Sequence, residues 1–363
     1  MRSLGRSTLG VTALVLTSGV GMATAQTTYP NVKVTGRAQE QFYYFSNDDY
    51  PFATVGPKSN FFLRRVRVEA RGNISENVSF FIQPSFEGGN VSGVRLRDAY
   101  IDVRLTPADR PTAIYLRGGQ EKRPFGRYEL TSSNNLPSIE RGGGRGLIRN
   151  VASNDLFTAA GFLSHDVGAS LRVEHKLDDV RLVRLTVGAY DGDGESRLDG
   201  NNGKSFGARA TVGVTPKLDV GGSFFSHDGI VGTDSSFNNS AWGLDAAWGK
   251  PGEEGLYLVG DYMQGKAFTA VKPDIRGISL VGAYNIRMKS PTSWLYAIEP
   301  AFRFDMSDPD TDADDNGSTL ITAVLGFYLS SRVQFRVAYE SQSFQATGAE
   351  SINGVRSALT VNF

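Results

Sequence analysis

Apolar and polar residues alternate one by one along most of this chain. In residues 355–363 the apolar positions are separated by polar or small ones: Val355, Leu359, Val361 and Phe363 are interleaved with Arg356, Ala358, Thr360 and Asn362. Residues 32–45, 293–305 and 332–342 repeat this alternation. Successive side chains of a β-strand point to opposite faces, whereas a helix spaces its apolar residues three or four apart. The pattern therefore predicts strands that have one apolar and one polar face.

About sixteen segments carry this pattern. We place them at residues 32–45, 60–73, 78–87, 94–105, 112–120, 166–176, 180–190, 204–214, 218–226, 240–249, 255–264, 276–287, 293–305, 317–329, 332–342 and 354–363. An even number of antiparallel strands is typical of single-chain bacterial outer-membrane barrels. We therefore expect an all-β fold, a transmembrane antiparallel β-barrel of about 16 strands.

The connections between these segments alternate between short and long. Short connections are expected at residues 72–77, 176–179, 214–217, 250–254, 289–292 and 330–331. Long polar connections are expected at residues 46–58, 191–202, 227–239, 265–275, 306–316 and 343–353. Outer-membrane barrels have short periplasmic turns on one side and longer external loops on the other. A soluble β-sandwich has no reason to keep this alternation, so the connections favour the barrel.

The N-terminal residues have the features of a secretory signal peptide. Arg2 and Arg6 precede a mostly apolar run, residues 8–20, that is too short to span a bilayer as a helix. Small residues at Ala23 and Ala25 predict cleavage after Ala25. We therefore expect residues 1–25 to be a signal peptide and residues 26–363 to form the barrel.

The last residue, Phe363, closes an amphipathic strand. A terminal phenylalanine in that position is typical of chains that are inserted into the outer membrane. Together with the signal peptide it predicts the outer membrane of a Gram-negative-type bacterium, where lipid and lipopolysaccharide would surround the protein.

Composition is compatible with this reading and excludes several others. The mean hydropathy of −0.24 would suit a secreted soluble β-domain, but a barrel gives the same value because its lipid-facing and wet residues alternate. Cations exceed acids by six in residues 31–150 and acids exceed cations by eight in residues 151–363. Neither part has a long run of like charge, so no nucleic-acid partner is expected.

An enzyme is not expected either. The chain has three histidines and no cysteine, which leaves little material for a transition-metal site. Ser164, His165 and Asp166 are consecutive, so on a strand their side chains would point alternately and could not form a catalytic relay. We predict no catalytic residues.

The longest interruption of the strand pattern, residues 121–165, is rich in cations. It contains Lys122, Arg123, Arg127, Arg141, Arg145 and Arg149. Loops longer than about 12–15 residues are uncommon unless they have a function. If this loop folds into the lumen, it places several cations at the narrowest point, where reduced water strengthens their field on a passing anion.

The same segment resembles a known family. Residues 119–142, GQEKRPFGRYELTSSNNLPSIERG, are similar to the constriction-loop signature of the phosphate-selective porin O and P family, with its G-Q-x-K-x-P-F, E-x-L-T-S-S and I-E-R runs. Residues 62–72, FLRRVRVEARG, resemble the family's second strand, and residues 96–101, LRDAYI, resemble its D-A-Y strand. The resemblance is dense over residues 60–142 and diffuse afterwards.

The resemblance implies a sixteen-stranded homotrimer with an inward-folded constriction loop and a preference for anions. The candidate pore and anion-binding residues are Arg65, Arg67, Arg71, Arg104, Arg117, Lys122, Arg123, Arg127, Arg141, Arg145 and Arg149. Arg65, Arg67 and Arg71 share one parity and should face the lumen, because a cation on the lipid face costs about 2–4 kcal/mol at the bilayer midplane. Arg64 has the opposite parity, which predicts a β-bulge or an interfacial position.

The expected function is passive diffusion of small hydrophilic solutes through an outer-membrane porin that favours anions, with phosphate or polyphosphate as the narrower candidates. Two other functions stay open. If the arginines pair across the lumen with acids, the pore would be a weakly selective general porin; the acids in reach are Glu69, Asp98, Asp102, Glu121, Glu129 and Glu140. If the loop plugs the lumen, the chain would be a structural or adhesive barrel without significant conductance.

One acidic segment suggests a metal. Alternate carboxylates at Asp308, Asp310, Asp312 and Asp314 precede Gly317, as in calcium-binding loops. The distal glutamate of an EF-hand is missing, so a solvated external loop is the competing reading. Calcium at this external loop is the one cofactor that the sequence suggests.

Overall fold

The computed structural model describes residues 28–46, 59–86, 94–143, 152–232, 234–290 and 294–363. The predicted signal peptide, with cleavage after Ala25, lies outside the described residues. So do Arg145 and Arg149 of the predicted cationic loop.

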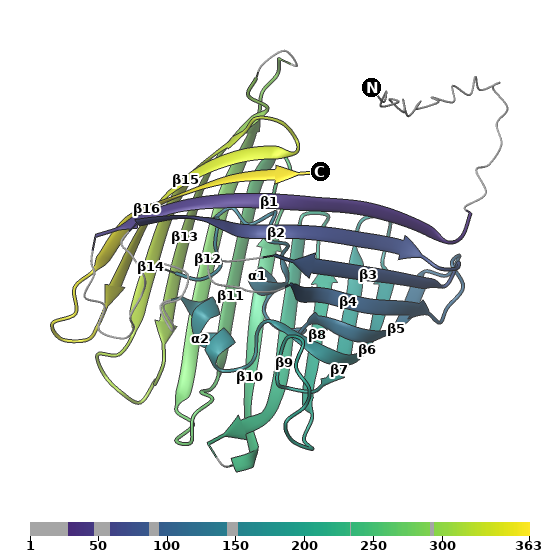
Figure 1. Cartoon of the computed structure of the whole chain (residues 1–363), viewed down its shortest axis with the longest axis horizontal. Coiled ribbons are helices and arrows are strands. Elements are labelled where there is room, and N and C mark those ends of the chain that lie inside the picture. The colour runs from purple at the N-terminus through teal and green to yellow at the C-terminus, as the bar shows by residue number, and fades with distance from the viewer. Residues whose placement is uncertain (1–27, 47–58, 87–93, 144–151, 233, 291–293) are drawn as a thin grey trace, which may run out of the picture.

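Sixteen antiparallel strands close into one barrel (Figure 1). They are β1 Asn31–Phe45, β2 Ser59–Asn73, β3 Val78–Ser85, β4 Arg95–Arg104, β5 Thr112–Lys122, β6 His165–Lys176, β7 Leu182–Tyr190, β8 Ser205–Gly213, β9 Leu218–Val231, β10 Asp234–Trp248, β11 Gly255–Lys266, β12 Asp274–Arg287, β13 Ala297–Asp308, β14 Ser318–Tyr328, β15 Val333–Phe344 and β16 Ile352–Asn362. Each strand pairs with its neighbours in sequence, and β1 also pairs with β16. The predicted fold and strand count are confirmed.

The alternation of the sequence becomes a difference between the two faces of the wall. In β1, Arg37, Gln39 and Gln41 point inward and are buried, whereas Val34 and Tyr44 point outward and are exposed. Polar residues are buried and apolar residues are exposed because the solvent outside the wall is lipid. The period of two therefore determines which residues reach the lumen.

The two ends of the chain seal the barrel. Gly36 and Phe363 exchange backbone hydrogen bonds of 2.9 and 3.0 Å. A Cβ atom at position 36 would lie 2.4 Å from the ring of Phe363, so the closing strand fits only against glycine. The terminal phenylalanine thus lies on the outer face at the seam between β1 and β16.

Arg64 forms a β-bulge. Gln39 is opposite Arg65 and Glu40 is opposite Leu63, so Arg64 is an extra residue in β2. A bulge lets two successive side chains point to the same side of a sheet. The bulge predicted from the parity of Arg64 is confirmed, and it directs both Arg64 and Arg65 into the lumen.

One predicted loop is wrong. Residues 227–239 were expected to form a long polar connection, but β9 continues to Val231 and β10 begins at Asp234. The two strands extend as a hairpin at the end of the barrel (Figure 1). The polar residues of this segment end the alternation expected of a strand that faces lipid. Strand pairing can still continue there, because both faces of the hairpin meet water.

The long loop between β5 and β6 folds into the barrel, as expected. It contains the short helices α1 Arg127–Leu130 and α2 Ser153–Ala159, which lie within the curve of the wall (Figure 1). Phe125, Phe157 and Phe162 of this loop pack with Phe225 and Met263 of the wall in a buried apolar cluster. This cluster anchors the loop to one side of the lumen. No helix among the described residues is long and apolar enough to cross a membrane.

Candidate functional site

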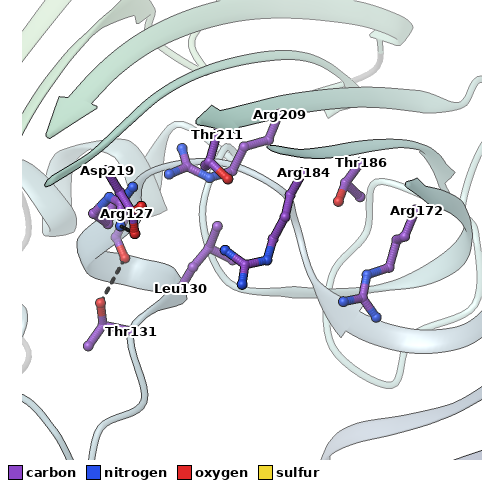
Figure 2. Close-up of a pocket in the computed structure, with 9 residues that line it drawn as sticks. All are labelled: Arg127, Leu130, Thr131, Arg172, Arg184, Thr186, Arg209, Thr211 and Asp219. Atoms are coloured by element: carbon purple, nitrogen blue, oxygen red, sulfur yellow. Dashed lines mark hydrogen bonds and ion pairs between the residues drawn. The ribbon is translucent and has the colours of Figure 1, made fainter. Parts of the chain in front are cut away.

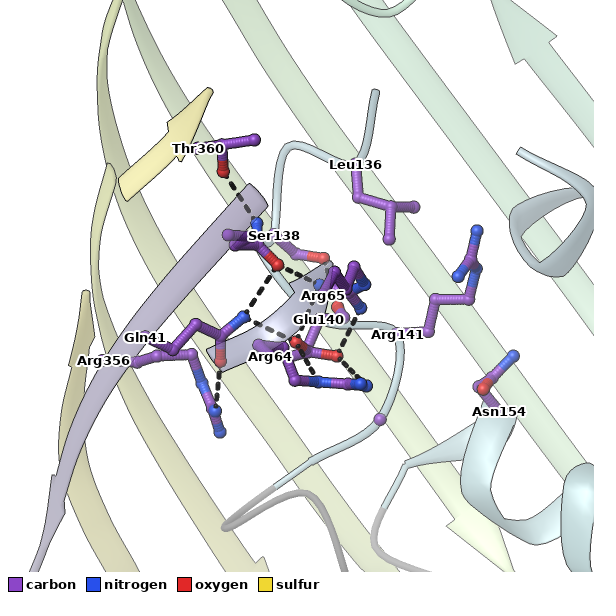
Figure 3. A network of polar contacts seen from close by, with 12 residues as sticks. Gln41, Arg64, Arg65, Leu136, Ser138, Glu140, Arg141, Asn154, Arg356 and Thr360 are labelled. Atoms are coloured by element: carbon purple, nitrogen blue, oxygen red, sulfur yellow. Dashed lines mark hydrogen bonds and ion pairs between the residues drawn. The ribbon is translucent and has the colours of Figure 1, made fainter. Parts of the chain in front are cut away.

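The inward loop is tied to β2 through Glu140 (Figure 3). Its carboxylate accepts hydrogen bonds from Arg64 at 2.9 and 3.0 Å and from Arg65 at 3.0 and 2.9 Å. Gln41 of β1 donates a further hydrogen bond of 2.7 Å. The bulge makes this arrangement possible, because without it only one of the two arginines would face inward.

Glu140 is therefore the counter-charge of two arginines. Its burial by itself would raise the pKa, but the guanidinium groups of Arg64, Arg65 and Arg356 hold the pKa of Glu140 well below its ordinary value. Next to it, Ile139 packs with Val324, Ala338 and Ala358 in the wall. Ion pairs and apolar contacts therefore hold Ile139 and Glu140 of the loop against β1, β2 and the strands β14 to β16.

A second ionic group lies within the loop itself. Lys122 contacts the Glu129 carboxylate at 3.0 Å, and Arg141 contacts the same carboxylate at 3.4 Å. Asn154 donates to Glu129 at 3.1 Å. Burial opposes ionisation of Glu129, but the two cations lower its pKa to about 2. Lys122 and Arg141, both predicted to bind anions, are thus occupied in holding the loop together.

Arg123 also has a structural position. It is buried, contacts Asp166 at 2.7 Å and donates to the carbonyl oxygens of Gly161 and Gly192. Its guanidinium joins the loop to the start of β6 and to the connection after β7. Arg123 thus holds the loop in place, and a direct role at the pore stays a prediction.

Among the described cations of the loop, Arg127 is the one that reaches open space in the lumen. The backbone N–H groups of Arg127 and Tyr128 donate to Asp261 at 2.9 and 2.8 Å, which fixes the start of α1 on β11. The Arg127 side chain contacts Asp245 at 2.6 Å. Asp245 also accepts two hydrogen bonds from Arg209, of 2.6 and 2.9 Å. One carboxylate therefore holds a loop arginine beside a wall arginine.

A cavity of about 460 Å³ lies between α1 and the strands β6 to β9 (Figure 2). Four arginines line it together with one acid and several small polar or apolar groups: Arg127, Leu130, Thr131, Arg172, Arg184, Thr186, Arg209, Thr211 and Asp219. Figure 2 shows the side chains of Arg172, Arg184 and Arg209 reaching into this space from neighbouring strands.

The sequence reading missed Arg172, Arg184 and Arg209. Strand register sets them in two adjacent rows, where Arg172 is opposite Thr186 and Thr186 is opposite Arg209, while Arg184 is opposite Thr211. Each of these arginines occupies a polar position in the alternating pattern of its strand. That position was the sequence signal that could have placed it in the lumen. Because β6, β7 and β8 are successive strands, the missing information was that the inward loop places α1 beside them.

In most ion pairs at the lumen the cation is the more exposed partner. The Arg184 side chain is 46% exposed and its partner Glu174 is 30% exposed, at 3.7 Å. For Arg127 and Asp245 the values are 17% and 2%. The acid is the more exposed partner in a few pairs, among them Asp219 with Arg127, at 46% against 17%, and Glu174 with Arg172, at 30% against 26%. In the Arg127–Asp245 and Arg184–Glu174 pairs a passing solute therefore meets the guanidinium group before the carboxylate.

The remaining predicted arginines are spread over the wall. Arg67 lies opposite Arg37 and contacts Gln83 at 3.5 Å, and the Arg71 guanidinium lies 4.0 Å above the Phe81 ring. Arg117 contacts Asp102 and Glu121 at 2.7 and 2.8 Å. Arg104 donates to Pro107 and Ala108 in a short turn, outside the constriction.

The acidic external segment is described, but its carboxylates do not converge. Asp308 contacts Arg276 at 3.0 Å, and Asp310 accepts a backbone hydrogen bond from Asp312. Within the part of the chain that the structure describes, no three His, Asp or Glu side chains form a group that could hold a metal ion. Calcium binding by Asp308, Asp310, Asp312 and Asp314 stays a prediction, which calorimetry with calcium can test.

Docking of the loop should depend on pH through Asp155. This carboxyl accepts hydrogen bonds from Gly143 and Ala152 at 2.8 and 3.3 Å, and burial raises its pKa from 3.8 to about 7. Because the docked loop binds the proton more tightly than an undocked one, docking is most favourable at low pH. It should weaken by up to about tenfold per pH unit as the pH rises toward 7.

Hydrogen exchange of residues 152–164 between pH 5 and 8, corrected for intrinsic rates, measures this dependence. In that range Glu129 and Glu140 stay ionised, because their pKa values are lowered. The Asp155→Asn variant should show protection that changes less with pH. An unchanged slope in this variant would assign the effect to another group.

Comparison with known proteins places this geometry among porins. The family model of the phosphate-selective porins O and P matches residues 32–230. The anion-selective porin of Comamonas acidovorans has a TM-score of 0.61 at 14% identity, with 92% of this chain and 100% of that chain covered. No curated protein matches the chain significantly.

Two further solved structures have the same architecture. The trimer form of OmpT from Vibrio cholerae has a TM-score of 0.57 at 13% identity, with 92% and 99% of the two chains covered. OmpF of Salmonella typhi, solved with daunomycin, has a TM-score of 0.62 at 11% identity, with 92% and 97% covered. At such low identities the likeness establishes the fold alone.

Proposed function

This chain belongs to the phosphate-selective porin O and P family and is an outer-membrane porin, and from this premise we propose that its lumen passes small hydrophilic solutes with a preference for anions. The cluster of Arg127, Arg172, Arg184 and Arg209 around the open cavity carries the proposal. Arg123 and Arg141, which were also predicted to lie at the pore, do not contribute to this cluster, because they hold the loop in place.

The cavity suits weak, distributed binding. Among the described residues, the carboxylates that Arg172 and Arg184 contact lie 3.4 to 3.7 Å away, so the N–H groups of both arginines can turn toward a solute. Thr186 and Thr211 add hydroxyl groups between the arginines. Conduction requires sites that attract an ion without trapping it, and several partly neutralised cations along a wall meet that requirement.

Phosphate and other oxyanions are the narrower part of the proposal. The planar guanidinium group donates two parallel hydrogen bonds to an oxyanion, which chloride cannot accept in the same way. Arg172, Arg184 and Arg209 come from three neighbouring strands and reach one space. We therefore expect inorganic phosphate to compete with chloride for this cavity.

The competing function is a weakly selective general porin. It is favoured by the pairing of lumen arginines with acids, since Arg117, Arg172 and Arg209 all have carboxylate contacts. Each pair lowers the net field in the lumen. The anion preference should therefore be moderate.

Reversal potentials in a planar bilayer with a KCl gradient test the proposal. We expect a potential of the sign that chloride permeation gives, and a chloride current that decreases when phosphate is added. A potential of the cation sign would overturn the anion preference. Normal anion selectivity without phosphate block would remove only the oxyanion part, and negligible conductance would favour a plugged structural barrel.

We also propose that the barrel assembles as a homotrimer. OmpT of Vibrio cholerae, which shares the fold, has been solved in a trimer form. The outer face of this chain carries large exposed apolar residues on its first two strands, among them Val34, Phe61 and Leu63. Mass measurement of the detergent-solubilised protein before and after heating would identify the assembly.

A further inference from the structure

One acid of the basic cavity, Asp219, has a carboxylate that is open to a solute. Its side chain is 46% exposed, whereas that of Asp245 is 2% exposed. Asp245 is held by Arg127 and by two hydrogen bonds from Arg209. Among the described residues the Asp219 carboxylate has a single contact, with Arg127 at 3.7 Å, which is too long for a hydrogen bond. Its oxygens can therefore accept hydrogen bonds from a solute.

Strand register places this acid apart from the exposed arginines of the cavity. Asp219 of β9 is opposite Gly213 of β8, and Arg184 of β7 is opposite Thr211, two residues before Gly213. Strands about 4.8 Å apart that rise about 3.4 Å per residue therefore separate the backbones of Arg184 and Asp219 by about 12 Å, with Thr211 between them. Figure 2 shows Arg172 farther from Asp219 than Arg184 is.

The space between these charges is larger than an inorganic anion requires. The cavity volume of about 460 Å³ falls within the range of about 300–1,000 Å³ that is usual for sites of small organic ligands. A phosphate ion held by Arg172 and Arg184 does not reach the part near Asp219. Thr211 contributes a hydroxyl group to that part, and Leu130 of the loop contributes an apolar side chain. This half of the cavity therefore suits the body of an organic molecule.

The charges around Asp219 favour a hydroxyl group over an amine. An ammonium group at this carboxylate would be repelled by Arg127, which contacts the same carboxylate, and by the other guanidinium groups of the cavity. A hydroxyl group donates a charge-assisted hydrogen bond to a carboxylate and adds no charge of its own. Because Asp219 also repels a phosphate group, a phosphorylated solute should direct its phosphate toward Arg184 and its hydroxyl groups toward Asp219.

We propose that this cavity prefers phosphate monoesters of sugars and polyols over inorganic phosphate. The phosphate group lies between Arg172 and Arg184, and a hydroxyl group of the solute donates to Asp219. The proposal rests on the anion preference proposed above for the same cavity, and it adds Asp219 as the residue that determines which anions are preferred.

Block of the chloride current in a planar bilayer by two phosphate monoesters of similar size tests the proposal. Glucose 6-phosphate carries hydroxyl groups and cyclohexyl phosphate does not, whereas the phosphate group is the same in both. We expect glucose 6-phosphate to block at a concentration about fivefold lower, which is the contribution of one hydrogen bond. Glucosamine 6-phosphate, in which an amine replaces one hydroxyl group, should block no better than glucose 6-phosphate.

Substitutions at position 219 assign the preference to the carboxylate. Asp219→Ala should remove the difference between the two esters and make block by inorganic phosphate slightly stronger, because a repelling charge is lost. Asp219→Asn keeps the shape and one acceptor oxygen, so it should retain part of the difference and serves if the alanine variant does not fold. Asp179→Ala removes an exposed acid in the turn between β6 and β7, outside the cavity, and is the control for loss of negative charge.

Four results would overturn the proposal. Equal block by the two esters would show that the cavity recognises only the phosphate group, and the anion preference would stand. A parallel loss of block by inorganic phosphate and both esters in Asp219→Ala would mean that Asp219 only positions Arg127. Stronger block by glucosamine 6-phosphate than by glucose 6-phosphate would assign an amine to Asp219. If neither inorganic phosphate nor any ester reduces the current, the oxyanion part of the proposed function fails together with this inference.

Discussion

Replacing Glu140 by glutamine is expected to release the inward loop from β2 and to destabilise its docked state by about 3–5 kcal/mol, the range for breaking a buried ion pair. Glu140 is the only carboxylate with which Arg64 and Arg65 form ion pairs in the described chain. Glutamine keeps the size of the side chain but removes the charge. Buried Arg65 would then lose the carboxylate that neutralises it, and Arg64 would lose one of its contacts.

The release should be visible in single-channel recordings and in limited proteolysis. The open-channel current should become larger and noisier, because the loop would no longer be held against one side of the lumen. Cleavage near residues 131–143 should become faster. Glu253→Gln, in an exposed short turn, should change neither measurement.

A second substitution distinguishes charge from shape. Adding Arg65→Met to the Glu140→Gln variant removes one uncompensated cation, so part of the lost stability should return. If Glu140→Gln alone leaves current, noise and cleavage unchanged, the apolar contacts of Ile139 and the phenylalanine cluster hold the loop without the ion pairs.

Neutralising Arg172 and Arg184 together is expected to reduce the ratio of anion to cation permeability by at least about fivefold. A charge at 4 Å contributes about 1 kcal/mol even at the dielectric constant of water, and that energy corresponds to roughly fivefold. The double variant Arg172→Gln and Arg184→Gln also leaves Asp102 and Glu174 without these partners. The acids behind the arginines would then face the lumen, and the reversal potential should move toward the cation sign.

The corresponding lysine variants separate charge from hydrogen-bond geometry. Arg172→Lys with Arg184→Lys keeps both charges, so the reversal potential should stay close to that of the unmodified protein. Block by phosphate should weaken, because lysine cannot donate the paired hydrogen bonds of a guanidinium. Arg181→Gln, which removes an exposed turn arginine paired with Asp178, is the control for a general loss of charge.

A reversal potential that the glutamine variant leaves unchanged would show that these arginines do not control selectivity. The remaining candidates would then be Arg64 and Arg71, which also border the lumen as the more exposed partners of their ion pairs.

The strands of the barrel wall could be predicted from the sequence, because the orientation of each side chain depends only on its position within its own strand. Each strand residue faces either lipid or lumen, so a period of two marks strands, and an arginine at the wrong parity marks a bulge, as at Arg64. The same reasoning failed at residues 227–239, where the strands pass beyond the lipid and polar residues no longer mark a loop.

The interior of the barrel depends on partners that are far apart along the chain. Arg127 meets Asp245 across 118 positions, and Arg303 reaches the carbonyl oxygen of Glu140 across 163 positions. Nothing near Arg123 indicates that Asp166 will neutralise it, and nothing near Arg184 indicates that it will border a cavity. The sequence alone indicates which strand residues face the lumen, because apolar side chains contact the lipid and polar side chains contact the water-filled interior. Which of those cations face the solute and which hold the loop follows from closure of the barrel, since closure alone brings distant charges within a few ångströms.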